Sequence, residues 1–297
     1  MITPYYKSSN KDFTLLQGDC VEMMNQFDFK FDMIFADPPY FLSNGGISIQ
    51  SGKVVSVNKG DWDRSQGLEK DMEFNMRWIS ACRDKLTDKG TIWISGTYHN
   101  IFSVAHCLQQ LGFKILNVIT WEKTNPPMNV SCRFFTYSTE FIIWARKSEK
   151  HPHYFNYDLM KELNGGHQMK DVWRLPAIAP WEKSCTKHPT QKPLALLTRI
   201  IQASTKERDW VLDPFTGSST TGIAANLLNR RFLGIDITPG FLEISMARHR
   251  EIEDEATATI YRHKIAKVNE KERVTGQQFL DLEVCEQAAF YDRELPF

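Results

Sequence analysis

The ten residues from Phe31 to Tyr40 (FDMIFADPPY) constrain the fold of this chain more than any other stretch. Their apolar part, Phe31 to Ala36, is short and partly aromatic, which is typical of a buried strand. Two successive prolines then remove two backbone donors and fix φ, so neither a helix nor a sheet ladder can continue past Asp37. The sequence therefore predicts a strand that ends in a carboxylate, two carbonyls and an aromatic ring.

Six further apolar runs have the length of strands, and most of them alternate with helix-like segments. This pattern predicts an α/β protein with one doubly wound, mostly parallel, seven-stranded Rossmann-like sheet. The runs at 113–122 and 139–146 have no helix between them, which indicates an antiparallel edge. In such a sheet, ligands bind at the carboxyl ends of the strands. The other four runs lie at 13–17, 91–96, 210–213 and 231–236.

The groups that follow the strand at 31–36 suit one kind of substrate. A carboxylate and a rigid carbonyl can accept both hydrogens of an exocyclic amine, and a tyrosine ring can stack on the flat base that carries the amine. The competing interpretation is an ordinary turn, because Asp and Pro are common turn residues.

A second motif, DPFTGSSTTG at 213–222, follows a predicted strand and begins a predicted helix. Small residues let a ligand approach the backbone, and the free amides of a helix N-terminus can bind a carboxylate. Asp236 follows Asp213 by 23 positions (236 − 213), close to the interval at which an acidic residue binds ribose hydroxyls. Only one glycine precedes the hydroxyl cluster, which favours a ligand with one sugar and a carboxylate over a dinucleotide. A tight turn with an unrelated Asp is the alternative.

Charge and cysteine content exclude several classes of protein. Thirty-six basic and 36 acidic residues cancel, so a nucleic acid would have to be held by a local basic surface. The six cysteines form no C-x-x-C pair, which indicates buried thiols in a reducing compartment and no metal site. No stretch approaches 18 apolar residues. We therefore expect a cytoplasmic protein without a membrane segment.

Together these residues resemble the amino-methylating DNA methyltransferases, specifically the adenine-N6 enzymes of the permuted β group. ADPPY resembles their catalytic motif, and DPFTGSSTT resembles their S-adenosyl-L-methionine motif, which usually has glycine where Ser219 stands. The segments LLQGD, GDWD, GTIWISG, WEKTNPP, TEFIIWARK and KHPTQKP also resemble segments of the family. The resemblance covers roughly residues 12–250, with the catalytic motif before the cofactor motif, which implies a circularly permuted order.

The resemblance implies a site-specific enzyme that methylates adenine N6 in double-stranded DNA. Asp37 and the Pro38 carbonyl would accept the amine hydrogens, and Tyr40 would stack on the flipped-out base. Asp19 would approach the adenine ring of the cofactor and Asp236 its ribose, while Lys192 can neutralise its carboxylate. The full set of expected cofactor residues is Asp19, Cys20, Asp37, His188, Thr190, Lys192, Asp213, Phe215, Gly217, Ser218, Ser219, Thr220 and Asp236.

Four segments are expected along the chain: the catalytic half of the domain (1–146), a target-recognition segment (147–187), the cofactor-binding half (188–256) and an acidic extension (257–297). Residues 123–199 contain twelve Lys and Arg against six Asp and Glu, a net charge of +6 (12 − 6). A solvated basic face without a partner is the alternative to DNA binding. The residues expected to contact DNA are Lys123, Arg133, Lys147, Lys170, Arg174 and Lys183.

Other functions remain open at this point. A cytosine-N4 methyltransferase would use the same geometry but commonly has serine at the position of Asp37. An RNA or protein-amide methyltransferase and a non-catalytic S-adenosylmethionine-dependent DNA-binding module are more distant alternatives, and the glycine pattern disfavours a NAD oxidoreductase. The resemblance also implies a restriction-modification setting, and it leaves open a homodimer and a cognate restriction endonuclease as partners.

Overall fold

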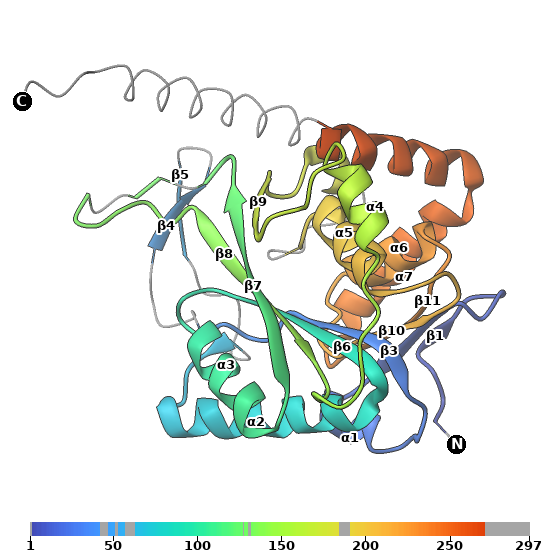
Figure 1. Ribbon diagram of the computed structural model, residues 1–297, viewed down its shortest axis with the longest axis horizontal. Coiled ribbons are helices and arrows are strands. Elements are labelled where there is room, and N and C mark those ends of the chain that lie inside the picture. The colour runs from blue at the N-terminus through green and yellow to red at the C-terminus, as the bar shows by residue number, and fades with distance from the viewer. Residues whose placement is uncertain are drawn as a thin grey trace, which may run out of the picture.

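A nine-stranded sheet forms the centre of the computed structural model, which describes residues 2–41, 47–50, 53–56, 63–126, 128–129, 132–183 and 191–270. From β2 to β6 all neighbouring strands are parallel, whereas β8 is antiparallel to both β6 and β7 (Figure 1). The spatial order is β1 (Tyr6–Lys7), β2 (Phe13–Gln17), β11 (Arg231–Asp236), β10 (Trp210–Asp213), β3 (Phe31–Ala36), β6 (Leu86–Gly96), β8 (Thr139–Arg146), β7 (Lys114–Lys123) and β9 (Val172–Leu175).

The predicted doubly wound, mostly parallel sheet is confirmed, and all seven predicted strands form. Two short strands that the sequence did not reveal, β1 and β9, extend the sheet at its two ends. The position of the antiparallel strand differs from the prediction. Because β9 pairs with the outer side of β7, the antiparallel strand β8 lies inside the sheet and not at its edge.

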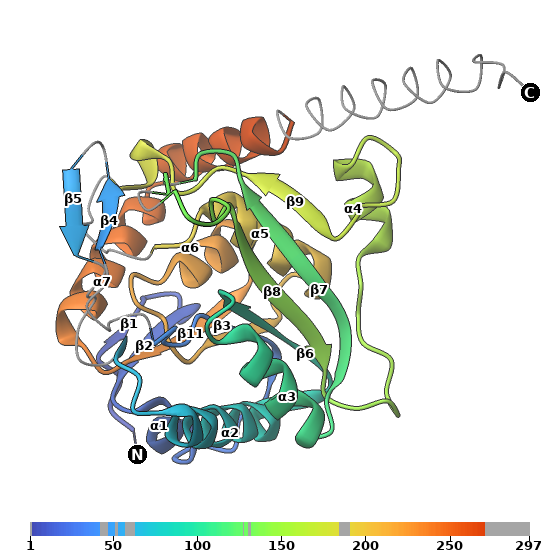
Figure 2. The same ribbon diagram turned by 90° about the vertical axis from the view of Figure 1, so that its left-hand side faces the viewer.

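Helices cover both faces of the sheet (Figures 1 and 2). One face carries α1 (Cys20–Met24), α2 (Leu68–Lys85) and α3 (Ile101–Gln110). The other face carries α4 (Tyr157–Leu163), α5 (Leu194–Ser204), α6 (Thr220–Leu227) and α7 (Pro239–Glu253). Strand residues alternate between the two layers, because successive side chains point to opposite faces. In β3, Phe35 packs on the α5–α6 side, whereas Ile34 and Ala36 pack on the α2–α3 side.

The strands that carry the two sequence motifs are neighbours in the sheet. Val211 of β10 lies opposite Met33 of β3, although most of the chain separates them in sequence. From β10 the chain passes through α6 to β11 on one side, and from β3 it passes through α2 to β6 on the other. This reversal opens a crevice at the carboxyl ends of β3 and β10, where open α/β sheets bind ligands. A circularly permuted relation to other members of the family stays a prediction.

Two of the segments expected from the sequence are packed into the main domain. The expected target-recognition segment contributes β9 to the central sheet and α4 to the core. The expected acidic extension begins within a helical stretch, 255–270, in which Ala258 and Ile265 are buried; residues 271–297 lie outside the described part. The hairpin of β4 (Ile47–Gln50) and β5 (Lys53–Ser56) forms a two-stranded sheet of its own.

The cysteines agree only in part with the expectation of buried thiols. Cys20, Cys82 and Cys107 are buried, but Cys132 is exposed because it lies in the link between β7 and β8. Cys185 and Cys285 lie outside the described residues. Among the described helices, none combines the length and the apolar character that crossing a membrane requires.

Gly222 of α6 lies where the helix approaches two buried rings. A Cβ atom at this position would lie 2.4 Å from Cε1 of Phe232 and 2.6 Å from Cε2 of Phe13, well inside van der Waals contact. We therefore expect Gly222→Ala to lower the free energy of unfolding by about 1–3 kcal/mol, despite the better helix propensity of alanine. Denaturant unfolding measures the change. In Gly240→Ala, the matched control, the new Cβ would meet nothing within 4 Å; equal stability of the two variants would contradict this prediction.

Candidate active site

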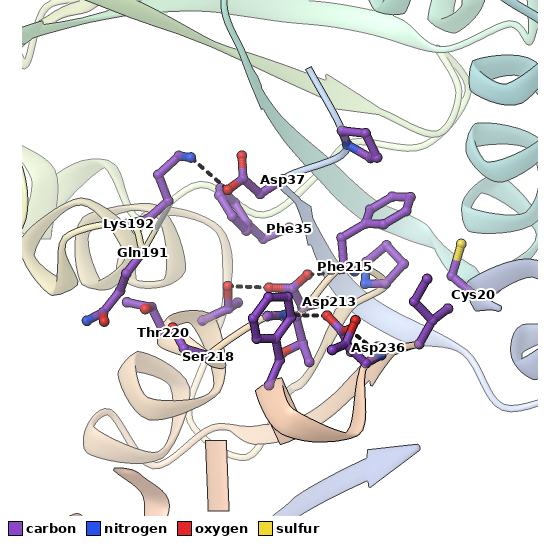
Figure 3. Close-up of a pocket in the computed structure, with 18 of the residues that line it drawn as sticks. Cys20, Phe35, Asp37, Gln191, Lys192, Asp213, Phe215, Ser218, Thr220 and Asp236 are labelled. Atoms are coloured by element: carbon purple, nitrogen blue, oxygen red, sulfur yellow. Dashed lines mark hydrogen bonds and ion pairs between the residues drawn. The ribbon is translucent and has the colours of Figure 1, made fainter. Parts of the chain in front are cut away.

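Asp37 directly follows β3, as the double proline predicted, and its carboxylate accepts three hydrogen bonds. Lys192 Nζ donates to Oδ2 at 2.6 Å. The hydroxyls of Tyr40 and Ser95 both donate to Oδ1 at 2.5 Å. Figure 3 shows Lys192 and Asp37 facing each other across the upper side of the site. Residues from three separate parts of the chain therefore fix the orientation of this carboxylate.

The same contacts set the charge of the pair. Burial alone raises the pKa of Asp37, but the charge and hydrogen bond of Lys192, with the bonds from Ser95 and Tyr40, outweigh burial and hold it below its usual value. Burial alone lowers the pKa of Lys192, but Asp37, Tyr40 and Glu140 raise it well above the usual value. A buried pair of this kind stays ionised at neutral pH because each charge stabilises the other.

Lys192 has a partner that the sequence did not predict. Its side chain is only 8% exposed, and Nζ also lies 3.8 Å from Oε2 of Glu140. Glu140 in turn pairs through Oε1 with Lys123 of β7 at 2.5 Å. The expected neutralisation of a cofactor carboxylate by Lys192 stays a prediction, because its ammonium group is committed to Asp37 in this structure.

Tyr40 and Pro38 are buried in the loop that carries Asp37. The Tyr40 ring is 6% exposed and lies under Lys192, whose Nζ is 5.1 Å from the ring centroid. Asp63 holds the loop, since its Oδ1 accepts the backbone amides of Tyr40 and Phe41 at 2.9 Å each. Of the loop residues 37–41, only Asp37 and Pro39 line the adjoining cavity. Stacking of Tyr40 on a base therefore stays a prediction.

A cavity lies between the loop after β3, the end of β2, the loop after β10 and the end of β11. Most of the predicted cofactor residues line it, and Figure 3 shows several of them surrounding one space. Ser219 does not line it, while His188 and Thr190 lie outside the described residues. The predicted residues that the structure brings together are Asp19, Cys20, Asp37, Lys192, Asp213, Phe215, Gly217, Ser218, Thr220 and Asp236.

Apolar rings and acidic groups dominate the lining. The rings of Phe35, Phe74, Phe215 and Phe241 provide flat apolar surface, and the described part of the lining includes four aspartates and one lysine. This lining suits a ligand that combines a flat ring system with positive charge. Sequence reasoning missed Phe74 and Phe241, because both belong to helices, α2 and α7, whose apolar positions look like ordinary core positions.

Two side chains of α7 hydrogen-bond to the loop after β10. Arg248, which is 4% exposed, donates to the Ser218 carbonyl at 2.7 Å and to the Thr220 hydroxyl at 2.8 Å. Ser245 donates to the Gly217 carbonyl at 2.8 Å. No motif in the sequence signalled either α7 residue. The predicted hydroxyls of Ser218 and Thr220 thus position the loop as well as line the cavity.

Ser219 belongs to the turn of this loop and does not line the cavity. It has φ of 55°, in the left-handed region, and its side chain is fully buried against the Thr216 hydroxyl at 2.8 Å. Glycine adopts this conformation without strain, which explains why glycine would suit the position. The structure places Ser219 in a turn-forming position, and its expected cofactor contact stays a prediction.

Asp236 and Asp19 both bind backbone amides at the rim of the cavity. Asp236 accepts the amides of Gly217 at 2.9 Å and Thr238 at 2.8 Å, which ties the ends of β10 and β11 together. Asp19 caps α1 by accepting the amides of Val21 and Glu22. Beside it, burial raises the pKa of the Cys20 thiol to about 12, so this group stays neutral.

Asp213 titrates near neutral pH. Burial chiefly raises its pKa to about 7, and the bonds from Thr221 (2.6 Å) and the Phe215 amide (3.0 Å) only partly oppose this. Because the pKa in the folded protein lies above the ordinary 3.8, this group favours folding below pH 4 and loses that contribution as pH rises through 7.

The thermal stability of Asp213→Asn, measured relative to the wild type, should be higher at pH 8 than at pH 5, because asparagine does not ionise. Thermal unfolding of both proteins at the two pH values measures the difference. A difference that does not change with pH would contradict the shifted titration.

Only some of the residues predicted to contact DNA lie at the edge of the sheet that carries Asp37. Lys147 follows the end of the antiparallel strand β8, so it lies at the opposite edge, where its ammonium binds the Leu86 carbonyl at 2.8 Å. Its expected contact with DNA stays a prediction. Lys123 and Arg174 pair with Glu140 and Glu122. Arg133 and Lys170 are exposed, and the side chain of Lys183 lies outside the described residues.

Comparisons with known proteins agree with this geometry. A family model described as DNA methylase (N6_N4_Mtase) matches residues 31–247. The chain is 58% identical over 252 residues to the type II methyltransferase M2.MboI of Moraxella bovis, covering 84% of this chain and 92% of that protein. It is 56% identical over 250 residues to M2.DpnII of Streptococcus pneumoniae, with the same coverage.

Solved structures share the fold. The M1.HpyAVI–SAM complex superposes with a TM-score of 0.62 at 29% identity, covering 80% of this chain and 98% of that one. The cytosine-N4-specific PvuII DNA methyltransferase has a TM-score of 0.67 at 18% identity, covering 90% and 96%. At that identity the second likeness concerns the fold alone.

Proposed function

Because this chain belongs to the DNA methylase family, we propose that it transfers a methyl group from S-adenosyl-L-methionine to the N6 amine of adenine in a short recognition sequence of DNA. The observation that carries the proposal is Asp37, an ionised carboxylate held by three donors at the rim of a cavity built for a nucleoside. An amine with a delocalised lone pair needs such an acceptor to become a nucleophile.

The cavity fits S-adenosyl-L-methionine by the chemistry of its lining. Its aromatic rings suit the adenine, and the aspartates among its described lining residues suit the sulfonium and ammonium charges. Asp236, at the end of β11, stands where ribose hydroxyls are bound in nucleotide-binding sheets. When bound, the cofactor supplies an electrophilic methyl group, so the chain itself has to provide only orientation and charge.

Asp37 has one oxygen with room for the substrate. Oδ1 already accepts two hydrogen bonds, from Tyr40 and Ser95, whereas Oδ2 accepts one, from Lys192. A carboxylate oxygen has two lone pairs, so Oδ2 can accept one hydrogen of the adenine amine. The Pro38 carbonyl accepts the second hydrogen in this proposal. The two bonds localise the nitrogen lone pair, and the surplus proton leaves to Asp37 or to water after transfer.

The target base has to leave the duplex, because its amine is paired inside the helix. We assign the protein to a restriction-modification setting in the cytoplasm, with a cognate endonuclease that acts on the same sequence. Self-association into a homodimer and independence of metal ions belong to the same proposal. The last two points are tested in the purified protein by its molecular mass in solution and by its activity with a chelator present.

The direct test is methylation of unmodified DNA by the purified protein, followed by sequencing that reports modified bases and their context. We expect N6-methyladenine within one short motif and no mark when S-adenosyl-L-methionine is omitted. N4-methylcytosine in its place would identify a cytosine enzyme with the same geometry. Unmarked DNA after incubation with folded, cofactor-binding protein would refute the proposal.

A further inference from the structure

Four exposed aromatic residues, Tyr98, Phe134, Phe135 and Tyr137, lie in the turn after β6 and in the link between β7 and β8, and we call them the rim aromatics. Their exposed fractions are 42%, 56%, 97% and 53%. The rings of Tyr98 and Tyr137 are stacked, with centroids 4.6 Å apart and planes 12° apart. Phe134 lies beside Tyr137, with centroids 5.5 Å apart. Four large rings with this much exposure are unusual on a surface that contacts only water.

The rim aromatics are continuous with the Asp37 site. Tyr98 follows β6 three residues after Ser95, whose hydroxyl binds Asp37. In the same turn, the Asn100 side chain donates to the Pro39 carbonyl at 3.5 Å. The other three rings belong to the link between β7 and β8, two strands that run side by side in Figure 2. Because Gly96 pairs with Phe141 of β8, this link leaves the sheet at the same edge as Asp37.

Charge and shape favour nucleic acid as the occupant. Within residues 124–138, which contain the link, Arg133 is the single charged residue, so no carboxylate there repels phosphates. Flat rings bind bases by stacking, and they do so without hydrogen-bond readout of sequence. A base that leaves a duplex exposes the faces of its neighbours and of its former partner. In bound DNA these base faces are exposed next to the flipped base, and the flipped base lies beside Asp37.

We propose that the rim aromatics are a DNA-contact surface that stacks on the bases left unstacked when the target adenine enters the site. The inference rests on the proposed function, since only an extruded base creates these faces. It assigns a role in holding the opened duplex to the β7–β8 link and the turn after β6, in addition to the DNA contacts expected from basic residues.

Binding of a short duplex tests the proposal, with the motif found by methylation sequencing and 2-aminopurine in place of the target adenine. The variants are Phe135→Ala, Tyr137→Ala and the triple variant with Tyr98→Ala. We expect each single variant to bind the duplex about tenfold more weakly, and the triple variant to lose the 2-aminopurine fluorescence increase. Phe135→Trp, which keeps a stacking face, should bind as the wild type does.

Phe29→Ala is the matched control, because Phe29 is 47% exposed but precedes the amino end of β3, at the opposite edge of the sheet. It should leave duplex affinity unchanged. S-adenosyl-L-methionine affinity should be equal in all variants. Duplex affinities within twofold of the wild type in the single and triple variants would overturn the proposal, as would a change of oligomeric state in the variants with unaltered DNA binding. A wild-type protein that binds cofactor but no duplex would overturn the proposed function as well.

Discussion

Asp37→Asn is expected to reduce the rate of methyl transfer about a thousandfold, the range typical of removing one electrostatic contact to a transition state. Asparagine keeps the size of the side chain but removes the negative charge that draws the amine hydrogens. Single-turnover transfer of a labelled methyl group to duplex DNA, at saturating cofactor, measures the effect without interference from product release.

Loss of folding has to be separated from loss of chemistry in this variant. Removing one member of a buried ion pair leaves the other charge unpaired, which costs about 3–5 kcal/mol. The double variant Asp37→Asn, Lys192→Met removes both charges and should regain thermal stability without regaining activity. If folded Asp37→Asn kept a rate within tenfold of the wild type, Asp37 would not be the acceptor of the amine hydrogens.

Lys192→Met is expected to move the acid limb of the pH–rate profile upward by about 1–3 pH units. In the wild type Lys192 opposes the effect of burial and keeps the pKa of Asp37 below its usual value. Without the ammonium group, burial dominates and Asp37 becomes protonated at higher pH. Activity should therefore fall at a higher pH in the variant than in the wild type, and recover as rising pH ionises the carboxyl again.

This profile distinguishes two roles for Lys192. If the ammonium group mainly bound the carboxylate of S-adenosyl-L-methionine, the variant would show a raised KM for the cofactor at every pH and an unshifted profile. Lys192→Arg keeps the positive charge and should keep the acid limb near its wild-type position. An unshifted profile in Lys192→Met would show that Asp37 does not depend on this lysine for its charge.

Local features of the sequence determined much of this protein. The apolar run before Asp37 and the two prolines after it suffice to predict a buried strand with a carboxylate at its end. The glycine and hydroxyl run after Asp213, with Asp236 after the next strand, predicted a nucleoside site because strand, turn and helix follow one another directly. Parallel strands joined by helices present their carboxyl ends at one edge, so the site location followed as well.

Tertiary structure alone decided which of these groups touch. Lys192 lies 155 positions from Asp37, and no local pattern shows that their side chains meet at 2.6 Å. Lys147 lies at the edge opposite Asp37, because the antiparallel pairing of β8 with β6 reverses the direction of that strand. The left-handed φ of Ser219 likewise appears only in the folded structure. Periodicity and turn chemistry are properties of neighbouring residues, whereas strand order, strand direction and charge pairing arise from contacts between residues far apart in the chain.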